Sequence, residues 1–343
     1  MLRVMQDRAL TPDSLDLAAM RSLLVVKPSS LGDVVHTLPA VALIKRAYPQ
    51  LSIRWVVRSE FMPLLDGNPD LDGTIEFPRA QMRGLGGVFK LFRWAKSALR
   101  EPAVPDLVID FQGLARSGVM AWCSGAREVI GLSDSREGAG LFHKWVVEVD
   151  AHGHAVDRYL EVPRALGIDC SGADELFRLQ GGALPAGVEF PEQPFVMLHP
   201  FSRGEGKSLS VGQVKTLCEA LAPLPVILVG RAEEELGPLR DGVIDLLNRT
   251  SLAELVAVTR RADFVISVDS GPMHIAAALS DRLVSLHTWS EPRMVGPYAA
   301  GAWVWKGGRL QKMGEYLPND EDPGLSREAL QEIAGLARQM VKY

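Results

Sequence analysis

The chain has 343 residues, of which 47% are hydrophobic and 23% charged, with a net charge of −5 at neutral pH. This length predicts two domains, and the composition excludes a wholly disordered chain. The charge gives no reason to expect nucleic-acid binding, and no apolar run approaches the length of a membrane span. The three cysteines, Cys123, Cys170 and Cys218, lack a CxxC pair, which argues against a disulfide framework or a zinc site and favours the cytosol.

Residues 1–20 are expected to form a polar N-terminal extension, with either Met1 or Met20 as the natural start. Acidic residues such as Asp7 and Asp13 stand where a signal peptide would be apolar, so no secretion signal is predicted. From residue 21, short β-rich runs alternate with helical stretches, which is typical of βαβ units. Strands are expected at 22–26, 52–57, 106–110 and 127–130, and helices at 37–48, 88–99 and 114–122.

A stretch rich in glycine and proline at 180–194 predicts an interdomain linker. The same alternation then resumes. Strands are expected at 195–198, 225–229, 263–268 and 283–287, and helices at 210–222, 232–240, 251–260, 272–280 and 325–342. The fold class is therefore α/β, with two halves and a cleft between them. Because open α/β sheets bind ligands beyond the carboxyl ends of their strands, the loops that follow strands are the places to search.

The loop after the first strand carries Gly32 and Asp33. Gly32 permits a close approach of the backbone, and Asp33 is placed where a carboxylate faces the cleft. Such a carboxylate takes a proton from a sugar hydroxyl when it lies within hydrogen-bond reach. The alternative is that Asp33 only caps the next helix.

The loop after the strand at 195–198 contains Gly206-Lys207-Ser208, which imitates the end of a P-loop. Phe201 stands where that motif requires a glycine, so a P-loop NTPase is excluded. What remains is a glycine-rich loop that brings Lys207 to a strand end, where an ammonium group suits a phosphate. A solvated surface lysine is the alternative.

The loop after the strand at 263–268 begins with Asp269 and Ser270, either of which is a suitable helix N-cap. Gly271 lets the backbone come close to a ligand, and the amide groups of such a helix start favour a diphosphate. The alternative is a well-capped structural helix in which His274 belongs to the core.

Four segments together resemble glycosyltransferase family 9, the bacterial lipopolysaccharide heptosyltransferases. They are 27–39, which is similar to the opening motif of the heptosyltransferase I group, 110–117, 154–158 and 268–278. The resemblance covers about residues 21–340 and implies a GT-B fold with two Rossmann-like domains facing a cleft. The acceptor would bind to 21–182 and the nucleotide-sugar to 183–324, with a C-terminal helix in 325–343 that packs back on the first domain.

The resemblance also implies an inverting transfer of heptose from ADP-L-glycero-β-D-manno-heptose to Kdo–lipid A. Asp33 falls on the family's general base, and Lys207 on a lysine that meets the donor diphosphate. The other donor-binding positions are Ser202, Glu234, Asp269, Ser270, Gly271 and His274, although Glu233 and Glu235 leave the register of Glu234 open. The acceptor-binding positions are Ser30, Gly32, Gln112 and Arg116.

No cofactor or metal ion is expected, because no Asp-x-Asp motif stands at a comparable strand end. The loop at 287–293 departs from the family's usual G-x-T-x-P motif, so the residues that contact the sugar and the nucleobase are not predicted. A family-9 enzyme with another donor or acceptor is therefore an alternative. A non-catalytic nucleotide-sugar binder is a second alternative, against which the presence of both Asp33 and Lys207 argues. A nicotinamide dehydrogenase is discarded, since the glycine-rich run at 84–87 does not complete G-x-G-x-x-G, because residue 89 is Phe89.

Between Arg79 and Arg100 the chain has six basic residues and no acidic one, interleaved with apolar side chains. A basic amphipathic stretch predicts binding to anionic lipid, and Arg83, Lys90 and Arg93 are its expected contacts. The partner would be the phosphorylated lipid A acceptor at the cytoplasmic face of the inner membrane. The protein is thus expected in the cytoplasm, peripherally associated with that membrane. An ordinary amphipathic helix with a solvated face is the alternative.

Overall fold

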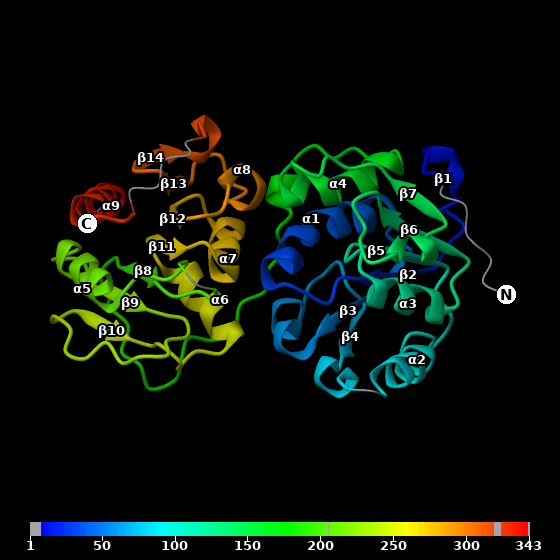
Figure 1. Cartoon of the computed structure of the whole chain (residues 1–343), viewed down its shortest axis with the longest axis horizontal. Coiled ribbons are helices and arrows are strands. Elements are labelled where there is room, and N and C mark those ends of the chain that lie inside the picture. The colour runs from blue at the N-terminus through cyan, green and yellow to red at the C-terminus, as the bar shows by residue number, and fades with distance from the viewer. Residues whose placement is uncertain (1–7, 85, 205, 319–323, 342–343) are drawn as a thin grey trace. The chain divides into compact units, whose positions relative to one another are not determined.

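The computed structural model describes residues 8–84, 86–204, 206–318 and 324–341 (Figure 1). The chain divides into two compact units, Met1–Arg178 and Leu179–Tyr343, close to the expected boundary at 182. Each unit is a seven-stranded sheet with helices packed on it. Residues 1–7 of the expected extension and residues 342–343 of the expected C-terminal segment lie outside the described residues.

The sheet of the first unit has the strand order β1-β7-β6-β5-β2-β3-β4 and is parallel throughout. Its strands are β1 Arg8–Ala9, β2 Ser22–Val26, β3 Ser52–Arg58, β4 Gly73–Phe77, β5 Leu107–Asp110, β6 Glu128–Leu132 and β7 Trp145–Val147. The central strands β2 and β5 are buried along nearly their whole length, as parallel strands covered on both faces are. The sequence predicted four of these strands and missed β1, β4 and β7.

Four α-helices cover this sheet: α1 Leu31–Ala47, α2 Gly87–Ala98, α3 Ala115–Ser124 and α4 Ala155–Ala165. In Figure 1, α1 and α4 lie on one face of the sheet, and α2 and α3 on the other. The helix expected at 37–48 begins earlier, at Leu31, because Ser30 caps it. This early start places Asp33 in the first turn of α1.

The expectation that residues 1–20 form a polar extension is wrong for the part the structure describes. Arg8 and Ala9 form β1, which adds a parallel strand beside β7. Leu10 and Leu17 are buried, and the Leu17 carbonyl accepts a hydrogen bond from Gln50. These two leucines anchor residues 8–20 to the first unit despite the polar residues around them.

The sheet of the second unit has the order β10-β9-β8-β11-β12-β13-β14, with only β14 antiparallel to its neighbour. Its strands are β8 Val196–His199, β9 Val226–Leu228, β10 Val243–Asp245, β11 Phe264–Val268, β12 Leu283–His287, β13 Trp303–Lys306 and β14 Arg309–Lys312. The α-helices are α5 Val211–Ala220, α6 Leu252–Arg261, α7 Gly271–Leu279, α8 Pro292–Val295 and α9 Arg327–Met340.

The helix expected at 232–240 is wrong, because that stretch is irregular. Gly237 adopts a left-handed conformation with φ of 67°, and Pro238 follows it directly. Both features end a helix. The chain instead reaches the sheet edge as β10, a three-residue strand that the sequence did not indicate.

The expected packing of the C-terminal helix on the first domain is also wrong. The helix itself is present as α9, but it packs on α5 within the second unit. Leu330, Ile333 and Ala337 follow helical spacing and belong to the hydrophobic core of that unit. The apolar face of α9 is thus buried within its own unit. Among the residues described, no helix is long and apolar enough to cross a membrane.

Candidate active site

The start of α1 is closed by Asp33 itself. Ser30 is the N-cap, and its backbone N–H and its hydroxyl donate to Asp33 Oδ2 over 2.9 and 2.7 Å. Asp33 therefore does cap the helix, which is one part of the alternative to a role as a base. Its side chain nevertheless keeps 34% of its surface exposed, so capping leaves the carboxylate accessible.

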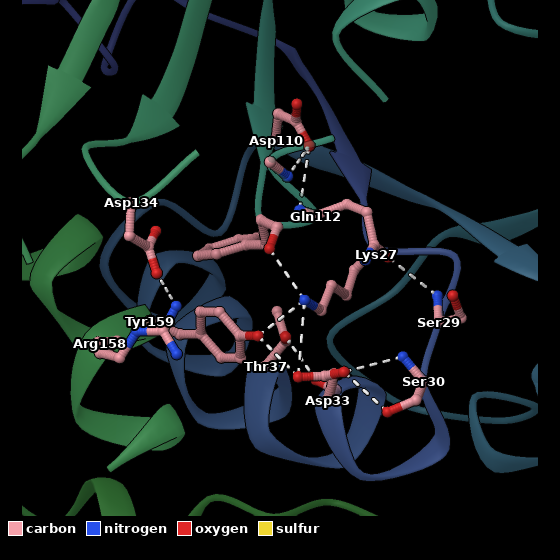
Figure 2. A network of polar contacts seen from close by, with 12 residues as sticks. Lys27, Ser29, Ser30, Asp33, Thr37, Asp110, Gln112, Asp134, Arg158 and Tyr159 are labelled. Carbon is pink, nitrogen blue, oxygen red and sulfur yellow. Dashed lines mark hydrogen bonds and ion pairs between the residues drawn. The ribbon is translucent and has the colours of Figure 1, made fainter. Parts of the chain in front are cut away.

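Two buried groups reach the other carboxylate oxygen of Asp33 (Figure 2). Tyr159, on α4, donates its hydroxyl to Asp33 Oδ1 over 2.9 Å. Lys27, directly after β2, lies with its Nζ 3.7 Å from the same oxygen and donates to Tyr159 Oη over 2.7 Å. Nζ also donates to the carbonyl oxygen of Phe111 over 2.9 Å. The sequence analysis missed both Lys27 and Tyr159 as site residues.

Electrostatics keep the Asp33 carboxyl ionised. Burial alone would raise its pKa, but the charge of Lys27 and the hydrogen bonds from Ser30 outweigh burial and hold the pKa well below the ordinary range. Burial lowers the pKa of Lys27, against the opposing pull of Asp33 and Asp110. Burial and the Asp33 charge raise the pKa of Tyr159, so its hydroxyl remains a donor.

The loop after β5 is ordered by Asp110. Its Oδ1 accepts the backbone N–H groups of Gln112 and Gly113, both at 3.0 Å. Gln112 in turn accepts the backbone N–H of Ser29 over 3.2 Å, so it lies against the loop that leads to Ser30. The structure thus brings Gln112 to the Asp33 loop.

The remaining expected acceptor residues are placed differently. Gly32 is buried in the first turn of α1, whereas Arg116 is exposed on the first turn of α3. Arg83, Lys90 and Arg93 are exposed on α2 and the segment before it. They belong to a basic surface on the face of the sheet opposite to α1, which carries Asp33.

In the second unit, Lys207 is held between a carboxylate and an aromatic ring. Its Nζ lies 3.1 Å from Asp269 Oδ2 and 4.3 Å from the ring centroid of Trp289. Thr288 Oγ1 donates to the carbonyl oxygen of Gly206 over 2.8 Å, which joins the two loops. Ser202 Oγ donates to the backbone oxygen of Asp269 over 3.3 Å, so Ser202 belongs to the same cluster. Trp289 is a residue that the sequence analysis did not assign to the site.

Burial alone would raise the pKa of Asp269. His287, a hydrogen bond from Ser290 and the charge of Lys207 outweigh it, so the pKa of Asp269 is lowered. Burial lowers the pKa of both His199 and His287 to about 4, which keeps both rings neutral at physiological pH. Lys207 lies 3.1 Å from Asp269 Oδ2 and is one of the charges that lower the pKa of Asp269.

The start of α7 is open, in contrast to that of α1. Ser270 occupies the N-cap position, but its side chain makes no capping hydrogen bond. Its hydroxyl instead lies 3.2 Å from His199 Nδ1 and donates to the carbonyl oxygen of Val268 over 3.1 Å. Gly271 opens the helix, and His274 is buried one turn on. Glu234 is exposed on the irregular stretch between β9 and β10.

The two lysine–aspartate pairs differ in which partner is the more exposed. In the first unit the lysine is 4% exposed and the carboxylate 34%, while in the second the lysine is 20% exposed and the carboxylate 10%. The first pair therefore exposes mainly its carboxylate, and the second exposes mainly its ammonium group. Within the described part of the chain, no cluster of three or more His, Cys, Asp or Glu residues is arranged to hold a metal ion.

Two mainly parallel α/β units with charged groups at their strand ends are the architecture of the GT-B fold. Residues 95–315 match the model of glycosyltransferase family 9 (heptosyltransferase), and the chain belongs to this family. The predicted family, fold and enzyme class are confirmed.

Curated relatives agree with this assignment, and solved structures share the fold. Lipopolysaccharide heptosyltransferase 1 of Pseudomonas aeruginosa is 30% identical over 88% of this chain and 89% of its own. The Salmonella typhimurium protein of the same name is 28% identical over 80% and 91%. A family 9 structure from Veillonella parvula has a TM-score of 0.79 at 19% identity, covering 95% of this chain and 98% of that one. Escherichia coli heptosyltransferase WaaC with ADP has a TM-score of 0.72 at 22% identity, covering 91% and 98%.

Proposed function

We propose that the protein transfers heptose from ADP-L-glycero-β-D-manno-heptose to Kdo–lipid A, with inversion at the anomeric carbon. The observation that carries the proposal is the opposite orientation of the two lysine–aspartate pairs. An outward carboxylate and an outward ammonium group are the two charges that a sugar transfer from a diphosphate donor needs. The names of the relatives support heptose and a lipopolysaccharide acceptor, and one related structure is titled with ADP-2-deoxy-2-fluoro heptose.

Asp33 acts as the general base in this proposal. Its Oδ1 takes the proton of the acceptor hydroxyl as that oxygen attacks the anomeric carbon, and the bond from that carbon to the diphosphate breaks. Attack from the side opposite the leaving group inverts the configuration. Asp33 is ionised at every physiological pH, so it is always ready to accept, although its low pKa makes it a weak base. Proton transfer is therefore expected late, when the hydroxyl oxygen has already lost electron density.

Lys207 and the open start of α7 stabilise the departing diphosphate. The diphosphate oxygens take the place of Asp269 as partners of the Lys207 ammonium group. The backbone N–H of Gly271 supplies a further donor, and the start of α7 supplies the positive end of the helix dipole. These groups provide the positive charge themselves, so we expect undiminished turnover in excess EDTA. A loss of turnover that magnesium restores would contradict this part of the proposal.

The basic helix α2 provides the contact with the acceptor's membrane. Its buried side includes Leu91 and Ala95, whereas Phe89 is 81% and Val88 62% exposed next to Lys90. Exposed apolar side chains beside unopposed positive charge suit a surface of anionic lipid. In this proposal the protein therefore works at the cytoplasmic face of the inner membrane.

Binding to liposomes that contain anionic lipid tests this contact. Charge reversal at Arg83, Lys90 and Arg93 should weaken binding, because each lost cation removes about 1 kcal/mol of attraction. Reversal at Arg309 and Lys312 on β14 is the matched control, since both are exposed basic residues of the other unit. An unchanged affinity in the triple variant would remove α2 from the proposal.

Mass spectrometry of Kdo–lipid A after incubation with ADP-heptose and the protein tests the reaction itself. A mass gain of one heptose that Asp33→Ala abolishes is the expected result. No gain from a folded protein that still binds ADP would favour the family-9 alternative with another sugar or acceptor. A protein whose function survives in Asp33→Ala would be a nucleotide-sugar binder rather than this enzyme.

A further inference from the structure

Lys27 and Tyr159 have no part in the chemistry described above, although they make the most buried contacts of the Asp33 network. We propose that they are positioning residues that hold Asp33 so that Oδ1 alone offers a free lone pair to the acceptor hydroxyl. The proposal rests on the proposed role of Asp33 as the base. It is carried by the hydrogen bonds and burial around the carboxylate (Figure 2).

The lone pairs of the carboxylate are unequally occupied. A carboxylate has about four acceptor sites, roughly two on each oxygen. Oδ2 accepts both the N–H and the hydroxyl of Ser30, so its sites are filled. Oδ1 accepts one hydrogen bond, from Tyr159, and lies 3.7 Å from Lys27 Nζ. The remaining acceptor site is therefore on Oδ1, within a side chain that is 34% exposed.

The direction of the hydrogen bonds is fixed by the lysine. An ammonium group only donates, so Lys27 must donate to Tyr159 Oη, and the tyrosine proton is left to point at Asp33. The second bond of Lys27, to the carbonyl oxygen of Phe111, ties the lysine to the end of β5. Lys27 and Tyr159 are each 3% exposed, so water does not compete for these contacts. The chain Lys27–Tyr159–Asp33 is thus ordered before substrate arrives.

The charges around this chain determine what its loss would do. Lys27 of the β2 end, His36 on the same helix as Asp33, Asp110 at the end of β5 and Arg158 on α4 face it. Burial opposes the charge of both Asp33 and Lys27, and each offsets it for the other. Without Lys27, burial of Asp33 is opposed by the hydrogen bonds from Ser30 and Tyr159 and by the weaker effect of His36. Its pKa should then rise toward the range in which enzymes are assayed.

The test compares kcat/KM for heptose transfer from about pH 5 to about pH 9 in the wild type, Lys27→Met and Tyr159→Phe. The wild type should show no loss of activity at the acid end that is due to Asp33. Lys27→Met should lower the maximum about ten-fold or more and bring into the assayed range an acid limb that the wild type lacks. Tyr159→Phe should lower the maximum with a smaller shift, because it removes the hydrogen bond but keeps the Lys27 charge.

Lys45→Met is the matched control, since Lys45 forms an ion pair with Asp72 at the far end of α1 and should leave the profile unchanged. Circular dichroism and ADP affinity report folding. If Lys27→Met does not fold, Tyr159→Phe decides alone. Wild-type profiles in the variants, or losses of the same factor at every pH, would overturn the positioning role. Activity that survives in Asp33→Asn would instead overturn the base on which it rests.

Discussion

The two units place a lysine and an aspartate at their strand ends, but each unit buries the opposite partner. Lys27 is buried beneath Asp33, whereas Asp269 is buried beneath Lys207. Burying one member of an ion pair fixes its charge in place, and the other member remains free to meet a substrate. In the proposed mechanism, the orientation of each pair, more than its composition, decides whether a strand end takes up a proton or holds an anion.

The starts of the two helices show the same contrast. Asp33 and Ser30 form a capping box at the start of α1, so side chains of the protein already occupy that helix start. Ser270 turns its hydroxyl to His199 and leaves α7 without a side-chain cap, so that helix start can accept a diphosphate. α1 therefore begins with a capping box that includes Asp33, whereas α7 begins without one.

Asp33→Asn removes the exposed carboxylate of the first unit and should have the largest effect. The amide keeps the size of the side chain but cannot take the proton, so kcat should fall about 10²- to 10⁴-fold. Steady-state rates of heptose transfer measure this. Asp72→Asn, which changes another paired aspartate of the first unit, should leave the rate unchanged.

Lys207→Met removes the exposed ammonium group of the second unit and should have the next largest effect. Loss of the cation should lower kcat/KM about 10²- to 10³-fold, because the charge that builds on the departing diphosphate is no longer met. The control is Lys312→Met, since Lys312 also lies over a tryptophan ring, that of Trp303 at 5.8 Å, but away from the strand-end loops. A fall of the same size in the control would show that the effect is not specific to the site.

Mild acid should weaken the second unit selectively. His199 and His287 have a pKa of about 4 when folded, against an ordinary 6.5, so the unfolded chain binds protons first as the pH falls. Their stability contribution is complete above about pH 6.5 and decreases toward pH 4, with about 2 kcal/mol lost per histidine by pH 5. The lowered pKa values of Asp33 and Asp269 act only at lower pH.

Hydrogen exchange at pH 7 and pH 5 measures this difference region by region. Protection should fall in β8 and β12, which carry these two histidines, more than in β2 and β5 of the first unit. His199→Gln should remove about half of the pH dependence, whereas His152→Gln, at an exposed position, should change nothing. Equal loss of protection in both units would contradict the assignment of the two buried rings.

Trp289→Ala should have the smallest effect, and it tests whether the Trp289 ring helps to hold the Lys207 ammonium group. A cation–π contact at an exposed site contributes about 0.5–1 kcal/mol, so ADP affinity should weaken about two- to five-fold. Calorimetric titration with ADP measures the change. Trp289→Phe retains a ring and should recover most of the affinity, and failure to recover would mean that the indole acts in some other way.

Local patterns in the sequence reveal part of this architecture. Asp33, Lys207 and Asp269 are predictable because each follows a buried strand within a few residues, at the edge where a parallel sheet binds ligands. Tyr159 is not predictable in this way, because it is 126 residues from Asp33 along the chain and contacts it only through the packing of α4 beside α1.

The fold shows the same limit. Periodicity predicts most longer helices and buried strands, whereas β7 and β10, of three residues each, are too short to leave a pattern. The periodicity of α9 predicts a helix but not its partner, because an amphipathic face fits any apolar surface. Choosing between the two units required the three-dimensional packing on α5.

The most direct test of the central claim measures ADP affinity and heptose transfer together in Asp33→Asn and Lys207→Met. Asp33→Asn should bind ADP as the wild type does but should not transfer heptose, while Lys207→Met should bind ADP more weakly. Transfer at the wild-type rate by Asp33→Asn, or unchanged ADP affinity in Lys207→Met, would contradict the division of labour between the two pairs.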